Sequence, residues 1–153
     1  MRICVISTPI FPCPPPGYSG LEQIAWRIAK ALADKGHQVT LVAPEGSATN
    51  HGPTIIPIKL GVDEKSAYDQ YWKHLSQVDV CIDHSWSKWS YVGKAEGWLK
   101  APILGVMHAP VDTMYRTLPP VEKPCFVCIS KDQASHFKDL FNREAKVAYN
   151  GID

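Results

Sequence analysis

Short apolar runs alternate with longer amphipathic stretches along this chain. Apolar runs of about four to seven residues, bounded by turn residues, are typical of buried strands. The runs fall at residues 2–7, 39–43, 54–60, 78–83, 102–107, 125–129 and 146–149. Pro57 either weakens the third run or places it near a sheet edge, because proline has no N–H to donate to a strand ladder.

Helical periodicity is clearest directly after the first run. Apolar residues recur at helical spacing from Leu21 to Leu32, and Gly36 is the expected stop. Further helices are predicted over residues 64–77, 85–99 and 131–141. Strands that alternate with helices predict an α/β fold, a Rossmann-like, open and mostly parallel sheet with helices on both faces. At 153 residues, the chain fits one domain.

Composition and charge exclude several classes of function. The 16 Lys and Arg residues nearly balance 15 Asp and Glu residues, which argues against nucleic acid as the main partner. No run approaches the roughly 20 apolar residues of a spanning helix, so membrane contact is peripheral at most. Pro9 and Pro12 interrupt the apolar N-terminus too early for a signal peptide. We therefore expect a cytoplasmic protein.

The five cysteines fit a reducing compartment, because they are odd in number and most lie in apolar runs. Cys125 and Cys128 have the spacing of redox and zinc sites. They lie within a predicted buried strand, where positions three apart point to opposite faces. No second cysteine pair accompanies them. We interpret both as small buried residues, and we expect no metal site.

The stretch from Pro12 to Glu22 joins the first strand to the first helix. Glycines at such a junction let the backbone approach a ligand, and a helix N-terminus offers free N–H groups to an anion. Gly17 and Gly20 lie there, with Ser19 as the expected N-cap and Glu22 in the first helical turn. This arrangement suits a phosphate or diphosphate.

Other polar residues follow the later strands, where ligands bind in open parallel sheets. His84 follows the fourth strand, His108 the fifth and Ser130 the sixth. A neutral His108 can donate a hydrogen bond to a sugar hydroxyl or a phosphate. A structural role and an acceptor-facing role are equally open for His84. Ser130 is first a helix N-cap, with a role in the cleft second.

Taken in order, these motifs resemble the N-terminal half of the retaining, nucleotide-sugar-dependent glycosyltransferases with the GT-B architecture (the family 4, "group 1" type). The resemblance spans the whole chain. The motifs are P-P-P-G-Y-S-G-L-E from Pro14, K-G-H-Q-V-T-L-V-A from Lys35, D-V-C-I-D-H-S from Asp79, V-M-H-A-P from Val106, C-I-S-K-D-Q from Cys128 and Y-N-G-I-D from Tyr149.

The resemblance implies an enzyme of two Rossmann-like halves, in which the N-terminal half holds a sugar or lipid-linked acceptor. By this resemblance, Gly17, Ser19 and Gly20 approach the diphosphate of the donor, and His108 lies beside the transferred sugar. Ser19 stands where the family usually has a second glycine. Residues His84, Glu22 and Ser130 would line the same cleft.

The resemblance also implies that Asn150 and Gly151 form the hinge to the second half, which holds the nucleotide. That half is absent from residues 1–153, so a donor-binding half, in the same or a separate chain, or self-association is expected to complete the site. The donor would be a nucleotide-diphosphate sugar, with no cofactor and no metal.

Two other classes of function compete with this one. The chain could be a non-enzymatic module that binds a glycan or sugar phosphate, or that assembles with itself. A dinucleotide-dependent oxidoreductase shares the fold, but the loop has no G-x-G-x-x-G pattern and the second strand ends without a ribose-binding acid.

Overall fold

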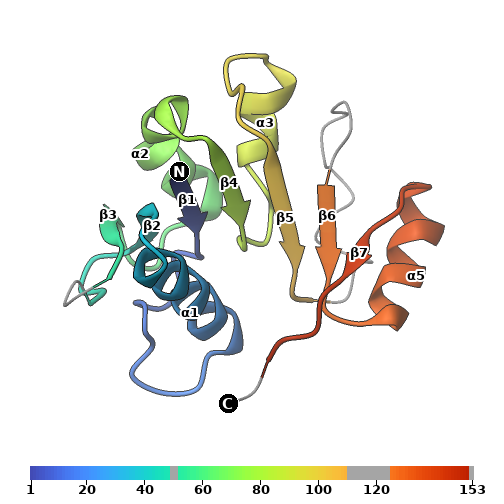
Figure 1. Cartoon of the computed structure of the whole chain (residues 1–153), viewed down its shortest axis with the longest axis horizontal. Helices are drawn as coiled ribbons and strands as arrows, with labels where there is room; N and C mark the ends of the chain where they lie inside the picture. Colours follow the sequence, from blue (N-terminus) through green and yellow to red (C-terminus); the bar gives the residue numbers. More distant parts are fainter. Residues whose placement is uncertain (49–51, 110–124, 152–153) are drawn as a thin grey trace.

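A computed structural model describes residues 1–48, 52–109 and 125–151. Seven strands form one sheet in the order β3-β2-β1-β4-β5-β6-β7 (Figure 1). The strands are β1 (Arg2–Ile6), β2 (Gln38–Pro44), β3 (Thr54–Ile58), β4 (Val80–Asp83), β5 (Ile103–Met107), β6 (Cys125–Cys128) and β7 (Lys146–Val147). Each neighbouring pair is parallel. The predicted strands are therefore confirmed, and β3, which contains Pro57, lies at the sheet edge as expected.

The helices agree with the prediction in part. They are α1 (Gly20–Asp34), α2 (Glu64–Tyr71), the 3₁₀ helix η1 (Trp72–Gln77), α3 (Ser90–Ala95) and α5 (Lys131–Phe141). The helix predicted over residues 64–77 is split between α2 and η1, and the one predicted over 85–99 is confined to α3. The loop expected at 118–124 lies outside the described residues. None of the described helices is long and apolar enough to cross a membrane.

Helix α1 packs on one face of the sheet. Its apolar stripe places Ala25 and Ala29 against Val5 and Leu41, and all four side chains are fully buried. The helix ends because Gly36 takes a φ of 85°, a left-handed conformation that favours glycine. The small alanines let α1 approach β1 and β2 closely, and this fixes where the N-terminus of α1 lies.

The opposite face of the sheet carries the other helices. Leu75, Tyr91 and Phe137 come from η1, α3 and α5 and pack into one cluster with strand residues such as Phe126. Gly105 in β5 makes room for this cluster, since a Cβ there would lie 2.9 Å from the Tyr91 hydroxyl. The prediction of helices on both faces is therefore confirmed.

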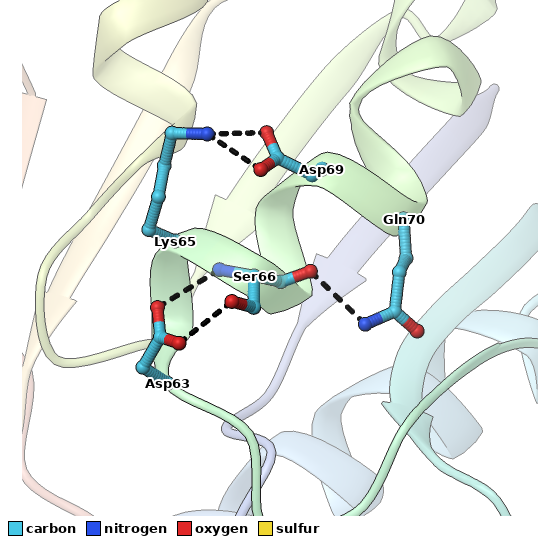
Figure 2. Close-up of polar contacts among 5 residues, drawn as sticks. All are labelled: Asp63, Lys65, Ser66, Asp69 and Gln70. Carbon is cyan, nitrogen blue, oxygen red and sulfur yellow. Dashed lines mark hydrogen bonds and ion pairs between the residues drawn. The ribbon is translucent and has the colours of Figure 1, made fainter.

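Hydrogen bonds fix the start of α2 (Figure 2). Asp63 is the N-cap and accepts from the Ser66 N–H at 2.9 Å and from its hydroxyl at 2.6 Å. The side-chain amide of Gln70 donates to the Ser66 carbonyl at 3.0 Å, and Lys65 pairs with Asp69 at 2.5 Å. These contacts set the position of Glu64, the first residue of α2, which reaches the loop after β4.

Candidate functional site

The winding of the sheet reverses between β1 and β4. From β1 the chain proceeds outward to β2 and β3, and it then returns to the other side of β1 to form β4, β5 and β6. Ligands of open parallel sheets bind at the carboxyl ends of strands at this reversal. The backbone N–H of His84 donates to the Ile6 carbonyl at 2.9 Å, so the ends of β4 and β1 lie side by side.

Glu22 gathers the side chains of the loop after β1. The residue is 3% exposed, and its carboxylate accepts hydrogen bonds from the hydroxyls of Thr8 and Ser19. Ser19 occupies the N-cap position of α1 as predicted, but its side chain makes no capping hydrogen bond. Ser19 is therefore the N-cap residue, but the expected hydrogen bond from its side chain to the helix is not formed, because the Ser19 hydroxyl binds Glu22. The N-terminus of α1 is left without a side-chain cap.

Gly17 and Gly20 lie on the outer side of this junction. Both are exposed, and a Cβ built on either would meet nothing within 4 Å among the described residues. Neither has the left-handed φ that favours glycine. Neither packing nor backbone conformation in the described chain therefore requires glycine at these two positions.

Two predicted histidines meet at the ends of β4 and β5. Nδ1 of His84 lies 2.7 Å from Nε2 of His108, and the two rings are tilted by 30°. His84 is 0% exposed, whereas His108 is half-buried. Burial lowers the pKa of His84 well below its usual value, with smaller effects from His108 and Lys88. Burial, with the charge of Lys88, lowers the pKa of His108 to about 4. Both rings are therefore neutral at pH 7.

Residues 84–89, which begin with His84, form a non-helical loop after β4. Asp83 accepts from the N–H and hydroxyl of Ser85 at 2.9 and 2.6 Å, and from the hydroxyl of Ser90. Glu64 accepts from the N–H of Trp86 at 2.7 Å and from that of the next residue, Ser87. These carboxylates bind backbone that a helix would use for itself, which explains why α3 begins late. Burial raises the pKa of Glu64.

Lys88 anchors the same loop from inside. It is 0% exposed, its φ is 53°, and its ammonium donates to the carbonyls of Ser85 and, at 2.7 Å, Val106. Burial lowers its pKa to about 8. Sequence reasoning missed this residue, because the fold rather than any local motif brings β5 to it. Trp89 directly precedes α3, packs against the core cluster and stacks on Tyr68, with ring centroids 5.9 Å apart.

Ser130 is the N-cap of α5, as predicted, and accepts from the Gln133 N–H at 3.0 Å. Gln133 was not predicted, although Ser followed three residues later by Gln is the signature of a capping box. Its side chain accepts from the Ile129 N–H at 2.8 Å and donates to the Ala109 carbonyl at 2.8 Å. Gln133 therefore joins the start of α5 to the residue after His108.

The two residues expected to form the hinge follow β7. Asn150 and Gly151 pass beside α1, where they line a cavity of about 450 Å³ with apolar residues such as Ile28 and Leu104. A second cavity, of about 850 Å³, lies at the amino ends of β1 and β2 and contains none of the predicted site residues. In the described residues, no three His, Cys, Asp or Glu side chains are grouped to bind a metal.

The cysteines of the C-x-x-C motif lie in β6 as expected and are free thiols. Cys128 is buried, but Cys125 is only half-buried, because alternate strand residues face the two sides of the sheet. Burial raises the pKa of the Cys128 thiol to about 11. This thiol is therefore poorly suited to redox or metal chemistry, which requires the thiolate.

Comparison with known proteins identifies the family of this chain. The model of Glycosyltransferase Family 4 matches residues 18–153. The chain belongs to this family. No curated protein sequence matches the chain. Solved structures match its fold.

AviGT4, a glycosyltransferase involved in avilamycin A biosynthesis, matches with a TM-score of 0.68 and 20% identity over 99% of this chain and 42% of its own. Alr3699/HepE from Anabaena, solved in complex with UDP-glucose, matches with a TM-score of 0.63 and 14% identity over 100% of this chain and 44% of its own. The chain thus spans less than half the length of each. Together with the parallel sheet, these matches identify the fold as one Rossmann-like half of a GT-B architecture, the N-terminal one, as expected from the sequence.

Proposed function

We propose that the chain is the acceptor-side half of a retaining glycosyltransferase, of the hexosyltransferase type, that uses a nucleotide-diphosphate sugar. The proposal rests on the groups that lie at the carboxyl edge of the sheet in this family 4 chain. There, the uncapped N-terminus of α1 and the His84–His108 pair lie at the ends of adjacent strands. We propose residues 1–153 as a single domain that acts together with a second half.

In this proposal, the N-terminus of α1 receives the donor diphosphate. Backbone N–H groups at a helix start carry a partial positive charge and bind phosphate without a metal. Gly17 and Gly20 keep side chains away from this approach, and the charge of Glu22 is turned inward onto the Thr8 and Ser19 hydroxyls. As the bond to the sugar breaks, the same N–H groups stabilise the charge that develops on the leaving diphosphate.

His108 contributes a hydrogen bond to the transferred sugar or to a phosphate oxygen. Its ring is half-buried at the end of β5, and its low pKa keeps it neutral, so it acts by hydrogen bonding rather than by charge. Ser130 lines the same carboxyl edge of the sheet. It accepts from the N–H of Gln133, whose side chain donates to the carbonyl of Ala109, the residue after His108. The acceptor, a sugar or a lipid-linked sugar, binds on this half.

The second half supplies most of the nucleotide affinity. Solved relatives have more than twice the matched length, which supports a donor-binding half in the same or a separate chain. Asn150 and Gly151, both at the end of the described chain, form the proposed hinge to it. This division of roles predicts weak nucleotide binding by residues 1–153 alone.

Reconstitution tests this proposal. The chain is mixed with, or fused through its C-terminus to, the donor-binding half of a family 4 enzyme, and transfer from radiolabelled nucleotide-diphosphate sugars to soluble and lipid-linked acceptors is measured. We expect transfer with retention of configuration. His108→Ala should lower its rate roughly a hundredfold, the usual effect of losing one preorganised donor.

His74→Ala, which changes an exposed histidine of η1, is the matched control and should transfer at the unaltered rate. An unaltered rate for His108→Ala would refute the role of His108. Saturable binding of a sugar phosphate without transfer by any reconstituted pair would instead favour a non-enzymatic binding module.

A further inference from the structure

The contact between His84 and His108 is one hydrogen bond, in which one ring nitrogen donates a proton to the other. Nδ1 of His84 and Nε2 of His108 are 2.7 Å apart, so one nitrogen must donate and the other must accept. A neutral imidazole carries one N–H, and its other nitrogen is an acceptor. The direction of this one hydrogen bond therefore fixes the tautomer of both rings.

The environment of His84 decides that direction. Its other nitrogen, Nε2, is fully buried and has no hydrogen-bond partner among the described residues. If Nε2 carried the proton, the protein would bury an N–H without an acceptor. An unfilled acceptor lone pair is tolerated more often than an orphaned N–H. The proton of His84 is therefore better placed on Nδ1, where it is donated to His108.

We infer that His84 is a positioning residue that holds His108 in the tautomer with its proton on Nδ1. Nε2 of His108 accepts from His84, so the nitrogen that His84 does not occupy is an N–H donor. The ligand group that His108 can bind is then an acceptor, such as a hydroxyl or phosphate oxygen. Only this last step, the identity of the ligand group, rests on the proposed function.

The groups around the pair favour two neutral rings. The ammonium of Lys88 is held on the Val106 carbonyl at 2.7 Å, and its charge opposes protonation of both histidines. Asp83, the nearest carboxylate in sequence, directs its oxygens to Ser85 and Ser90. Glu64 is likewise engaged by loop N–H groups. An imidazolium, which would present two donors and erase the tautomer, is therefore disfavoured.

Of the two roles left open for His84 by the sequence, this one is structural rather than acceptor-facing. With 0% exposure, His84 lies behind the half-buried His108 and acts through it. The backbone N–H of His84 on the Ile6 carbonyl keeps the ring in place at the end of β4. Because His84 is fixed at the sheet edge, its hydrogen bond sets both the ring orientation and the tautomer of His108.

Nitrogen NMR tests the inference on the chain without any donor or second half. With ¹⁵N-labelled histidine, long-range ¹H–¹⁵N correlations at pH 7 distinguish protonated from unprotonated ring nitrogens, and single substitutions assign the signals. We expect both His84 and His108 to be protonated on Nδ1. His84→Phe keeps a ring but removes the donor, so the His108 signals should shift to an average of two tautomers.

His84→Asn is the second variant, because its amide nitrogen lies near the position of Nδ1 and can restore the donated hydrogen bond. It should return His108 to the Nδ1–H form, and His74→Phe should leave His108 unchanged. Protonation of His108 on Nε2, or on both nitrogens at pH 7, overturns the inference. A His108 that stays wholly in the Nδ1–H form in His84→Phe overturns it as well.

The NMR result does not depend on the result of the transfer assay. Because the tautomers are measured without transfer, the expected spectra can be obtained even if His108→Ala leaves the transfer rate unaltered. Conversely, the wrong tautomer would leave the effect of His108→Ala on transfer standing. Wild-type spectra alone can refute the inference if the His84 variants fail to fold.

Discussion

Gly20 is the first residue of α1, and nothing in the described molecule requires it to be glycine. A Cβ there would meet no atom within 4 Å, and its φ lies outside the left-handed region. Glycine is also less favourable than alanine in a helix. In the proposed function, the open space beside Gly20 admits the donor diphosphate.

Gly20→Ala should therefore separate stability from function. We expect an equal or slightly higher melting temperature by circular dichroism, since alanine favours the helix. In the reconstituted assay, transfer should fall roughly tenfold, equivalent to about 1.4 kcal/mol of barrier, because the new methyl group crowds the diphosphate. An unaltered transfer rate with full stability would mean that no ligand approaches the backbone closely at this residue.

At the scale of elements, α2 supports the loop that carries the histidine pair. The carboxylate of Glu64, at the start of α2, accepts two N–H groups from the loop after β4. The N-cap Asp63 binds Ser66 and so fixes the first turn of α2, to which Glu64 belongs (Figure 2). The loop thus depends on a helix that precedes it by about twenty residues in the chain.

Removing this support should destabilise the protein. In Glu64→Ala, the N–H groups of half-buried Trp86 and exposed Ser87 lose their acceptor, and losing a typical hydrogen bond that water can partly replace costs about 1 kcal/mol. Urea unfolding measures the change. Asp69→Ala is the matched control, since Asp69 is an exposed acid on the same helix whose pair with Lys65 contributes little. Equal effects of the two substitutions would contradict the role of Glu64.

Elements fixed by local signals were predicted from the sequence. The apolar spacing and Gly36 define α1, and Pro57 marks the edge strand β3, because these signals act within a few residues. The late start of α3 was not predictable, since it depends on carboxylates from β4 and α2. Neither was the ring contact of His84 with His108. The sequence places both at one sheet edge, but only the packing of β4 against β5 brings their nitrogens together.

At the scale of the whole molecule, the histidine pair links the pH of the solution to folding. The pair lies at the ends of β4 and β5, in the middle of the seven-stranded sheet, where His84 is fully buried and His108 is half-buried. Unfolded histidines have a pKa near 6.5, whereas the pKa of His108 is about 4 in the fold. At pH values between these two pKa values, His108 is protonated in the unfolded chain but not in the folded chain.

Stability should therefore fall as the pH falls from about 6.5 to 4. The contribution of His108 is fully present above its unfolded pKa and is lost as the pH approaches the folded value, by up to about 3 kcal/mol. Urea unfolding at several pH values measures the slope. His108→Gln should flatten it relative to the wild type, whereas His74→Gln, at an exposed site, should leave it unchanged. Identical slopes for His108→Gln and the wild type would show that His108 does not stay neutral at the sheet edge.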